Sequence, residues 1–393
     1  MGDISTFLDN KRIPLKEDDR KQIKGEYPYY GASGIIDYVN DYIFDEELIL
    51  MGEDGANIVT RSSKLIFLAK GKYWVNNHAH VIKADNNINQ YFLSESLERI
   101  NYEKYNTGTA QPKLNREVCQ KIKVKIPQFN EQNKIANFLL VIDEKLRLLE
   151  QKYQYYQNFK KYLMQQIFTQ KLRFDDNCQY KTKQVKDFLI ESKIEGIDDI
   201  NKRLTVKLNL KGITVRESKT IEIEGATKQF IRKTGQFIYG KQNLHKGAFG
   251  IIPKELDGYL TSSDIPSFDF KGGIEPKWFY YYFARKSFYE KLENLSTGTG
   301  SKRISPKEFL NIKIIVPEFK EQHKIVCLLE KFDEKINGIS NQIVQMNMFK
   351  KSLLQQMFVV RINWRCNFKL AKSPSFNKHL LILKNKIIFI IIK

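Results

Sequence analysis

The residues best suited to chemistry in this chain gather in two short loops that combine small hydroxyl side chains with cations. One loop runs from Thr107 to Lys113 as TGTAQPK, and the other from Thr297 to Arg303 as TGTGSKR. Hydroxyl groups, backbone N–H groups and Lys or Arg are what proteins direct at phosphate oxygens. Each loop is therefore predicted to contact a nucleic-acid backbone, and a turn of purely structural use is the alternative. The predicted contact residues are Thr107, Thr109, Lys113, Thr297, Thr299, Lys302 and Arg303.

Two further loops combine glycine with groups that can touch a nucleic acid. The stretch from Gly25 to Gly34 holds Tyr29, Tyr30 and Ser33, and its glycines would let backbone approach a ligand closely. Tyrosine can hydrogen-bond phosphate or stack on an exposed base, although a buried tyrosine pair explains the pattern equally well. The other loop is basic and glycine-flanked, with solvated charge as its alternative explanation. Its predicted contacts are Lys241, His245 and Lys246.

No pattern in the sequence indicates a catalytic centre. The phosphate loop G-x-x-x-x-G-K-[ST] and a G-x-G-x-x-G after a strand are both missing. There is also no Asn/Asp-Pro-Pro-aromatic tetrapeptide of the kind that amino-methyltransferases use for a flipped base. His78-x-His80 could present two imidazoles on one strand face, but no third ligand is evident, so a structural role is favoured. We therefore predict neither catalytic residues nor a metal site.

The composition is strongly basic. Among 393 residues there are 65 Lys and Arg against 45 Asp and Glu, a formal net charge of +20. This charge favours polyanionic partners, because each neutralised phosphate releases counterions, while a lysine-rich genome is the alternative explanation. Four cysteines without C-x-x-C spacing indicate free thiols in a reducing compartment. Without a secretory signal or an apolar run of about 18 residues, the chain is predicted to be cytoplasmic and to have no membrane partner.

An internal repeat governs the architecture. When the sequence is laid on itself with a shift of 190, 17 of the 42 positions between 127 and 168 are identical to those between 317 and 358, without a gap. The match includes Pro127-x-Phe-x-Glu-Gln-x-Lys-Ile135 and its copy from Pro317 to Ile325. Self-similarity at a fixed shift indicates one structural unit used twice.

Each repeated segment is predicted to form one long helix with a coiled-coil seam, because apolar residues recur every seven positions over about four heptads. A helix of about 38 residues would span roughly 57 Å. Glu131-Gln132 and Glu321-Gln322 fall in the first turns, where acidic residues suit the helix dipole. Lys160-Lys161 and Lys350-Lys351 are expected on a solvated face. The predicted seam residues are Ile135, Ile142, Leu149, Tyr156, Leu163, Ile325, Phe332, Ile339, Met346 and Leu353.

The segments before each helix contain short β-like runs separated by Gly, Asn and Asp turns, and they differ from each other outside the Thr-Gly-Thr loop. The predicted fold class is α/β (α+β), with an internal repeat of two globular heads that suggest two different readers, each followed by a long helix. We expect the domains to be 1–126 and 175–316, the long helices to lie within 127–174 and 317–358, and 359–393 to form an atypical tail.

This arrangement resembles the specificity (S) subunit of type I restriction-modification systems over nearly all of residues 1–358. The resemblance rests on Gly31-Ala-Ser-Gly34, Gly52-Glu-Asp-Gly55, Thr107-Gly-Thr109, the Pro127–Ile135 motif and Gln165-Gln-Ile-Phe168, with second copies of the last three. No single motif is specific, whereas their order, doubled at constant spacing, is highly specific.

The resemblance implies a division of labour among subunits. Each head would be a target-recognition domain that reads one half of a split, asymmetric sequence in double-stranded DNA. The two long helices would pair antiparallel, give the repeat a pseudo-twofold arrangement and set the gap between the half-sites. The helices would also dock two methyltransferase (M) subunits, and two restriction (R) subunits would join them. S-adenosylmethionine, ATP and Mg²⁺ would then belong to those partners and not to this chain.

Two other functions stay open on the sequence alone. The chain could be a coiled-coil scaffold, although the dissimilar heads and the charge argue against that, or a DNA-modifying enzyme with its own site, against which the missing motifs argue. Residues 359–393 depart from the repeat and end in an apolar run. We expect them to be frame-shifted or read-through sequence, and the abrupt start suggests a missing leading segment.

Overall fold

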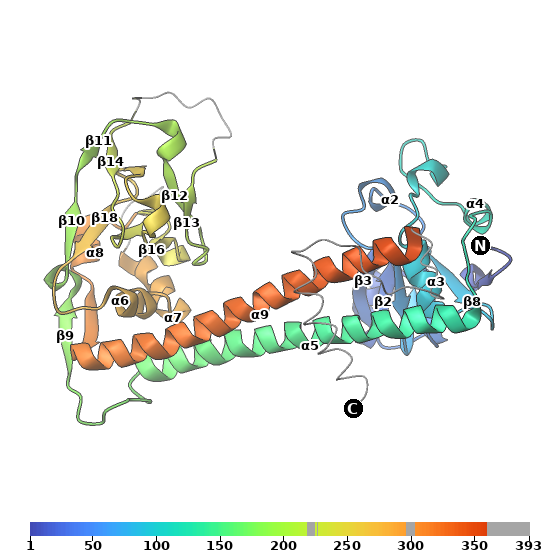
Figure 1. Ribbon diagram of the computed structural model, residues 1–393, viewed down its shortest axis with the longest axis horizontal. Coiled ribbons are helices and arrows are strands. Elements are labelled where there is room, and N and C mark those ends of the chain that lie inside the picture. The colour runs from blue at the N-terminus through green and yellow to red at the C-terminus, as the bar shows by residue number, and fades with distance from the viewer. Residues whose placement is uncertain (218–224, 226, 296–302, 360–393) are drawn as a thin grey trace, which may run out of the picture. The chain divides into compact units, whose positions relative to one another are not determined.

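The structure is a computed structural model that describes residues 1–217, 225, 227–295 and 303–359 (Figure 1). The chain divides into two compact units. The first unit comprises Met1–Arg147 and the chain from Val344 onward, and the second unit comprises Leu148–Ile343. Because both boundaries fall inside long helices, each unit contains one globular head and part of each helix. Within the described ranges, no helix is long and apolar enough to cross a membrane.

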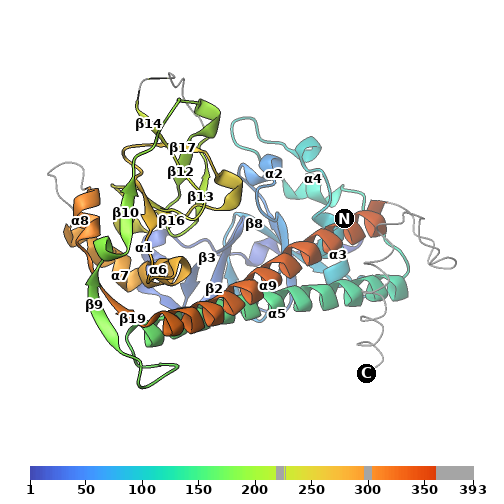
Figure 2. The ribbon, with the colours of Figure 1, turned by 60° about the vertical axis from the view of Figure 1, so that its left-hand side comes forward.

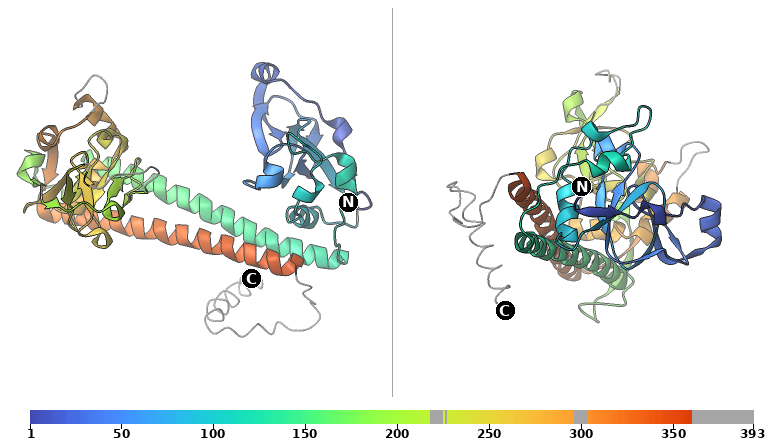
Figure 3. Two further views of the ribbon diagram at one scale, coloured as in Figure 1. Left: turned by 90° about the horizontal axis from the view of Figure 1, so that it is seen from above. Right: turned by 90° about the vertical axis from the view of Figure 1, so that its right-hand side faces the viewer.

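The first head is built on two sheets (Figure 3). One sheet has the antiparallel order β1-β8-β5-β6, and the other has the order β3-β2-β7-β4 with a parallel pair between β2 and β7. The strands are β1 (Ser5–Phe7), β2 (Lys24–Gly31), β3 (Gly34–Val39), β4 (Phe44–Asp45), β5 (Leu48–Gly52), β6 (Ile66–Ala69), β7 (Lys72–Val75) and β8 (Ala79–Ala84). The helices are α1 (Glu17–Gln22), α2 (Asn57–Thr60), α3 (Gln90–Leu97) and α4 (Arg116–Gln120).

Strand β5 is the centre of this head because it is buried on both faces. The side chains from Leu48 to Met51 are all fully buried. Successive side chains of a strand point to opposite faces, so Ile49 and Met51 join one apolar cluster while Leu48 and Leu50 join another. A continuous apolar run of this length is what a doubly covered strand requires.

The second head has a different set of sheets (Figure 2). Their strand orders are β10-β18-β15-β16, β11-β14-β17, β12-β13 and β19-β9. The strands are β9 (Tyr180–Gln184), β10 (Leu189–Ser192), β11 (Glu195–Gly196), β12 (Leu204–Val206), β13 (Ile213–Val215), β14 (Gln229–Ile231), β15 (Phe237–Tyr239), β16 (Phe249–Ile251), β17 (Leu260–Ser262), β18 (Ser267–Phe270) and β19 (Lys313–Pro317). The helices are α6 (Pro276–Phe283), α7 (Lys286–Tyr289) and α8 (Pro306–Leu310).

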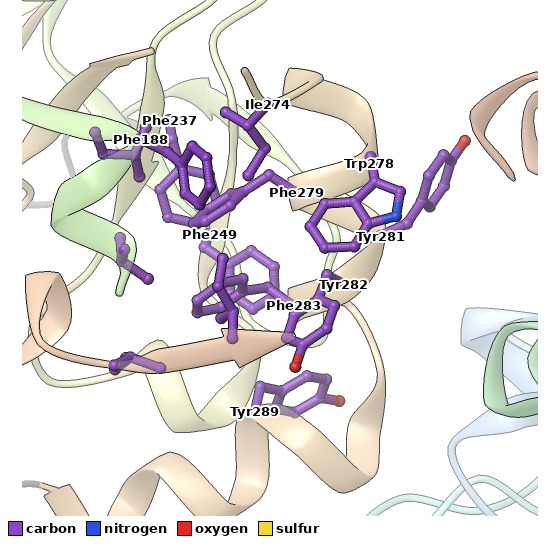
Figure 4. Packing of buried hydrophobic residues seen from close by; sticks show 14 of the residues in the cluster. Phe188, Phe237, Phe249, Ile274, Trp278, Phe279, Tyr281, Tyr282, Phe283 and Tyr289 are labelled. Atoms are coloured by element: carbon purple, nitrogen blue, oxygen red, sulfur yellow. The ribbon is translucent and has the colours of Figure 1, made fainter. Parts of the chain in front are cut away.

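An aromatic cluster forms the core of the second head (Figure 4). Helix α6 begins with Pro276, whose fixed φ suits the first helical turn, and after Lys277 its sequence reads WFYYYF. Phe279 and Phe283 of this helix pack on Phe237 of β15, at ring-centroid distances of 5.1 and 5.9 Å. Large buried aromatic side chains contribute much of a core's stability, so α6 is fixed firmly to the sheet.

The two long helices are α5 (Phe129–Phe168) and α9 (Phe319–Val359), of 40 and 41 residues. Five of the ten predicted seam residues are buried and five are half-buried. The buried ones are Ile135, Ile142, Leu149, Ile325 and Ile339. The half-buried ones are Tyr156, Leu163, Phe332, Met346 and Leu353.

Within each unit the two helices run antiparallel. In the second unit, Phe159 packs on Phe332 at 5.6 Å, while Ile167, further along α5, shares a core with Ile325, further back along α9. In the first unit, α5 and α9 are joined by an ion pair between Asp143 and Lys350. The predicted α/β fold, with its two heads, internal repeat and two long antiparallel helices, is confirmed.

The same polar arrangement joins the helices in both units. In the second unit, Lys160 of α5 pairs with Asp333 of α9, and the Tyr281 hydroxyl of α6 donates to the same carboxylate at 2.6 Å. In the first unit, Lys350 pairs with Asp143, and the Tyr91 hydroxyl of α3 donates to it at 2.5 Å. Burial and the neighbouring carboxylate raise the pKa of both tyrosines.

The expectation that both lysine pairs lie on a solvated face is wrong for Lys160 and Lys350. Their side chains are only 15% and 13% exposed, because each reaches across to the other long helix. Lys161 and Lys351, the next residues, are exposed as expected. Residues 360–393 of the predicted tail lie outside the described residues.

A glutamine ties each head to the start of a long helix. Gln132 Oε1 accepts from the backbone N–H of Asn89, and its Nε2 donates to Pro127 O at 2.9 Å. Gln322, at the equivalent place, accepts from the N–H of Glu275 and donates to Pro317 O at 3.0 Å. Asn89 and Glu275 are the N-cap residues of α3 and α6, so the same side chain positions one helix of each head.

Replacement of Asp333 by alanine is expected to destabilise the second unit by about 1–3 kcal/mol, because it removes the acceptor of Tyr281 and the counter-charge of the mostly buried Lys160. The measurement is the urea midpoint of unfolding. Asp176→Ala, at an exposed position, is the matched control and should leave the midpoint unchanged. Equal midpoints for the two variants would show that the ion pair contributes nothing.

Candidate nucleic-acid interface

Three loops that carry sequence motifs meet in the first head. Gly52 ends β5 beside the turn that joins β2 to β3. A Cβ atom added at Gly52 would lie 2.6 Å from the carbonyl oxygen of Ala32, so only glycine allows this approach. The Gly31–Gly34 turn and the Gly52–Gly55 turn therefore lie in direct contact.

The turn at residues 76–78 links these two loops. Asn76 donates its N–H to Tyr30 O at 3.0 Å and accepts the N–H of His78 on its own Oδ1 at 2.8 Å. His78 in turn holds Asp54, with 2.7 Å between Nδ1 and Oδ2. Asn76 is buried and His78 is exposed, so the buried amide positions the surface imidazole.

The Thr107–Lys113 loop is closed on itself and joined to the same surface. The Oδ1 of Asn106 accepts N–H groups from Gly108 at 3.0 Å and from Lys113 at 2.8 Å. A Cβ at Gly108 would lie 1.8 Å from Gln111 O, so the closure requires glycine. Gly55 N donates to Pro112 O at 3.0 Å, and this bond fixes the loop beside the Gly52–Gly55 turn.

Charge at this surface is balanced by Glu53. Its carboxylate lies 2.7 Å from Arg12 Nη1 and 3.4 Å from Lys113 Nζ. Lys113 is half exposed at its side chain, so it can turn from Glu53 toward an incoming phosphate at small cost. The arrangement is a hydroxyl-rich, conformationally fixed surface with one adjustable cation.

Beneath the surface lies a buried, charged histidine. His80 Nδ1 is 2.7 Å from Asp9 Oδ2 and its Nε2 is 2.7 Å from Leu114 O, and since both partners only accept, both ring nitrogens carry protons. Burial opposes this charge, but the hydrogen bonds and the negative charge of Asp9 raise the pKa of His80 to about 10. Burial also disfavours the charge of Asp9 and would raise its pKa. The contacts with His80 nevertheless hold the pKa of Asp9 below its ordinary value. The structural role expected for His78-x-His80 agrees with these contacts.

The predicted contact residues of the first head differ in accessibility. Ser33, Thr107, Thr109 and Lys113 are exposed, and Tyr30 is half-buried. Tyr29 is only 1% exposed: its hydroxyl accepts the N–H of Leu15 and its ring lies under Arg20. The alternative of a buried core tyrosine therefore applies to Tyr29, whose ring is unavailable for DNA contact.

Those predicted contact residues of the second head that the structure describes lie on two neighbouring loops. Asp264 joins them, because its carbonyl accepts the N–H of Lys241 at 3.0 Å and its carboxylate pairs with Arg303 at 2.9 Å. His245 and Lys246 belong to a 3₁₀ turn that ends at Gly247, where φ is +72°. Lys246 is exposed, and His245 and Lys241 are half-buried. Thr297, Thr299 and Lys302 lie outside the described residues.

Several residues that build these surfaces carry no sequence signal. Asn76 and Asn106 each hold a loop through a buried or half-buried amide, and nothing in their spacing distinguishes them from other turn asparagines. Arg12 reaches Glu53 from 41 residues away. In the second head, the fully buried Arg232 was not foreseen, because a lone Arg after a short strand has no pattern.

A family profile described as the type I restriction modification DNA specificity domain matches residues 1–155 and again residues 179–346. The chain belongs to this family. The resemblance inferred from the motifs is thereby confirmed, and the repeat seen in the sequence corresponds to two specificity domains in one chain. Membership of this family assigns the chain to type I restriction-modification and to DNA recognition within it.

Curated relatives carry the same description. A protein of Haemophilus influenzae named as a type I restriction enzyme specificity subunit is 25% identical over 372 residues, covering 86% of this chain and 88% of the relative. The MjaVIII specificity subunit of Methanocaldococcus jannaschii is 22% identical over 397 residues, covering 92% of each. The crystal structure of the S subunit from M. genitalium superposes with a TM-score of 0.57 at 14% identity, covering 90% of this chain and 95% of that one. At that identity the likeness concerns the fold.

The charge on His80 makes the stability of the first head depend on pH. Because the native pKa is raised from 6.5 to about 10, the stabilisation is complete below about pH 6.5. It is lost as the pH rises toward 10, by about 1.4 kcal/mol for each pH unit. Hydrogen-exchange protection of β8 should fall over this range in the native protein.

His80→Gln should lower the protection of β8 at neutral pH and remove most of its dependence on pH. His78→Gln is the control, since that imidazole is half exposed and should leave the profile of β8 unaltered. A profile in His80→Gln as steep as in the native protein would contradict the assignment of the charge to His80.

Proposed function

We propose that this chain is the subunit of a type I restriction-modification enzyme that reads a bipartite, asymmetric DNA target and docks the methyltransferase and restriction subunits. The observation that carries the proposal is one specificity-domain profile matched twice in a chain whose two heads have different sheets. Two different heads on equivalent long helices suit the recognition of two different half-sites.

The attachment of the heads supports two independent readers. Each head is joined to the helices through the same elements, a glutamine at the start of a long helix and a tyrosine on an interhelical carboxylate. The solvent-facing loops differ outside the Thr-Gly-Thr motif that the two heads share: the first head presents Ser33, and the second presents Lys246 and the half-buried Lys241. Equivalent attachment with different loops would let each head change its half-site without disturbing the other.

The proposed role of α5 and α9 is to fix the number of base pairs between the half-sites. Each is a single uninterrupted helix, and the ion pairs Asp143–Lys350 and Lys160–Asp333 hold the same register in both units, since the paired numbers have the same sum. A continuous helix with fixed register has a fixed length, which is the property that a spacer needs.

The proposed docking of two copies of one partner is supported by exposed residues that are identical in both copies of the helix. Four such pairs are Phe129 and Phe319, Lys145 and Lys335, Lys161 and Lys351, and Gln165 and Gln355. Among the described residues, their side chains form no hydrogen bond or ion pair. Phe129, Lys145, Lys351 and Gln355 belong to the first unit, and the other four to the second. Each unit thus has the same exposed set, which suits a partner that binds twice.

We further propose that the chain itself performs no catalytic step. Its residues would bind and orient DNA, while S-adenosylmethionine, ATP and Mg²⁺ would be bound by the two methyltransferase and two restriction subunits. The DNA substrate is the reason to place the assembly in the cytoplasm. The surfaces described above offer hydroxyls, amides and cations for binding, a set suited to recognition.

The test is co-expression of the full chain with the methyltransferase subunit encoded beside it, followed by sequencing of methylated positions in the host DNA. We expect one split motif, two short half-sites separated by a fixed non-specific gap. A continuous motif, or no methylation despite a stable complex, would contradict the proposal. Methylation by the chain without its partner would show that it has a catalytic centre.

A matched pair of insertions makes this test quantitative. Seven residues added after Leu149 in α5 and after Ile343 in α9 keep the heptad seam and lengthen the paired helices by about 10 Å. At 3.4 Å per base pair, the gap should grow by about three base pairs with both half-sites unchanged. An unchanged gap in an active complex would show that the helices do not set the spacing.

The docking surface is tested by charge reversal. Lys145→Glu and Lys335→Glu should each weaken one methyltransferase contact by about tenfold, or 1.4 kcal/mol, and the double variant should weaken both. Native mass spectrometry of the complex reports the stoichiometry directly. Lys152→Glu is the control, because this exposed lysine corresponds to Gln342 in the second copy. Equal losses from the control and the identical lysines would refute the docking surface.

A further inference from the structure

A cavity of about 480 Å³ opens in the second head beside the loop that carries Lys241. It is lined by residues from the end of β10, from β14 and from the start of α8. The lining combines four cations and one carboxylate with the faces of Phe230 and two prolines. The cations are Lys193, Arg232, Lys241 and Lys307, and the carboxylate is Glu191.

The first sign of a ligand is a buried guanidinium that forms no ion pair among the described residues. Arg232 is 1% exposed, and its guanidinium donates to Thr261 Oγ1, Ser267 Oγ, Ser192 O and Ile265 O at 2.5 to 3.2 Å. All four acceptors are neutral, and within the described part of the chain no carboxylate forms an ion pair with it. Burial lowers the pKa of Arg232 to about 10 against the opposing effect of the nearby Glu191 carboxylate, so Arg232 stays protonated at neutral pH.

A buried cation that lacks a counter-ion is costly, and an anion in the adjoining cavity would offset that cost. Neither Lys241 nor Lys307 forms an ion pair among the described residues. Lys193 is the exception, since it pairs with Glu191 at 3.0 Å. The four cations and the one carboxylate that line the cavity leave a net of three positive charges.

The second, independent sign is a hydroxyl group. Ser192 is 7% exposed, it lines the cavity, and its Oγ is buried with no hydrogen-bond partner among the described residues. A hydroxyl in such a place ordinarily finds an acceptor, because an unmade hydrogen bond costs about 1–3 kcal/mol. The donor set around the cavity is therefore a hydroxyl, two lysines and a guanidinium charge, which is the set that binds phosphate oxygens.

We propose that this cavity receives a backbone phosphodiester of the half-site read by the second head. The inference rests on the proposed DNA-reading function and adds the place where the second head holds the DNA backbone. Phe230, Pro266 and Pro306 supply an apolar wall against which a deoxyribose can pack. Asp264 holds the backbone of Lys241 and the side chain of Arg303 beside the cavity, so two of the cations predicted for this head belong to one surface.

The experiment uses the complex of the full chain with its methyltransferase subunit and a duplex that carries the bipartite target. The variant is Lys241→Gln with Lys307→Gln, because substitution of Arg232 would unfold the head locally. Lys211→Gln with Lys254→Gln is the matched control, since both lysines are exposed on the same head and do not line the cavity. Loss of the phosphate contact should reduce the slope of log affinity against log salt by about 1, and the control should not.

A second measurement locates the contact. Neutral methylphosphonate groups are placed one at a time along the second half-site. In the native complex, substitution at one phosphate should weaken binding at least tenfold. In the lysine variant, methylphosphonate substitution at that phosphate, and at no other, should leave the binding affinity unchanged. In Ser192→Ala, the same substitution should weaken binding less than it does in the native complex.

The outcomes separate this inference from the function on which it rests. If the native complex does not bind a bipartite target, the proposed function fails and this inference fails with it. If the native complex binds but the lysine variant keeps its salt slope and its methylphosphonate profile, the cavity does not hold phosphate. A change in the preferred bases of the second half-site, without a change in slope, would show that the cavity reads a base and would overturn the phosphate assignment.

Discussion

The structure depends on the ion pair that joins the two long helices in each unit. Lys160 with Asp333 and Lys350 with Asp143 are mostly buried on the lysine side, and each carboxylate also accepts a tyrosine hydroxyl from a head. A half-buried charge pair with a third hydrogen bond tolerates little displacement, since sliding the helices by one turn would leave both charges unpaired. One interaction therefore fixes helix register and head position together. It also accounts for part of the 17 identities in the repeat, because Asp and Lys recur at both pairs of positions.

The attachment of each head to its long helix likewise depends on a single side chain. Gln132 and Gln322 each accept from the N-cap of a head helix and donate to the chain before the long helix, so a single side chain sets the entry of the helix and the place of the head. Beyond these anchors the two heads share little: the first centres on the doubly covered strand β5, and the second on the aromatic face of α6. The shared anchors leave the sheets and loops free to diverge, which is the condition for two readers with different targets.

The sequence predicted the parts of the molecule that repeat and missed the parts that meet only through tertiary structure. The heptad spacing from Ile135 onward was sufficient for the long helices, because periodicity is a local property. The role of Gln132 cannot be predicted in this way, because helix capping already explains a polar residue in the first turn. Tyr29 and Tyr30 were indistinguishable as neighbours in sequence, yet strand alternation buries Tyr29 and leaves Tyr30 half accessible. The meeting of the Gly31–Gly34, Gly52–Gly55 and Thr107–Lys113 loops depends on Asn76 and Asn106, whose hydrogen bonds no spacing rule foretells.

The distribution of identical residues within the chain is itself an argument about function. Identities such as Gln132 with Gln322 and Asp143 with Asp333 are explained by contacts inside each unit. Others, such as Lys145 with Lys335, are exposed and form no such contacts among the described residues. The sequence of an exposed surface diverges freely unless a partner binds that surface. The different heads show how far the two halves of this chain have diverged. A partner that bound only one unit would preserve one copy of these residues, whereas a partner that bound both units would preserve the pair. The proposed twofold docking of a methyltransferase subunit requires identity on the helices, the proposed asymmetric target requires difference in the heads, and the chain has both.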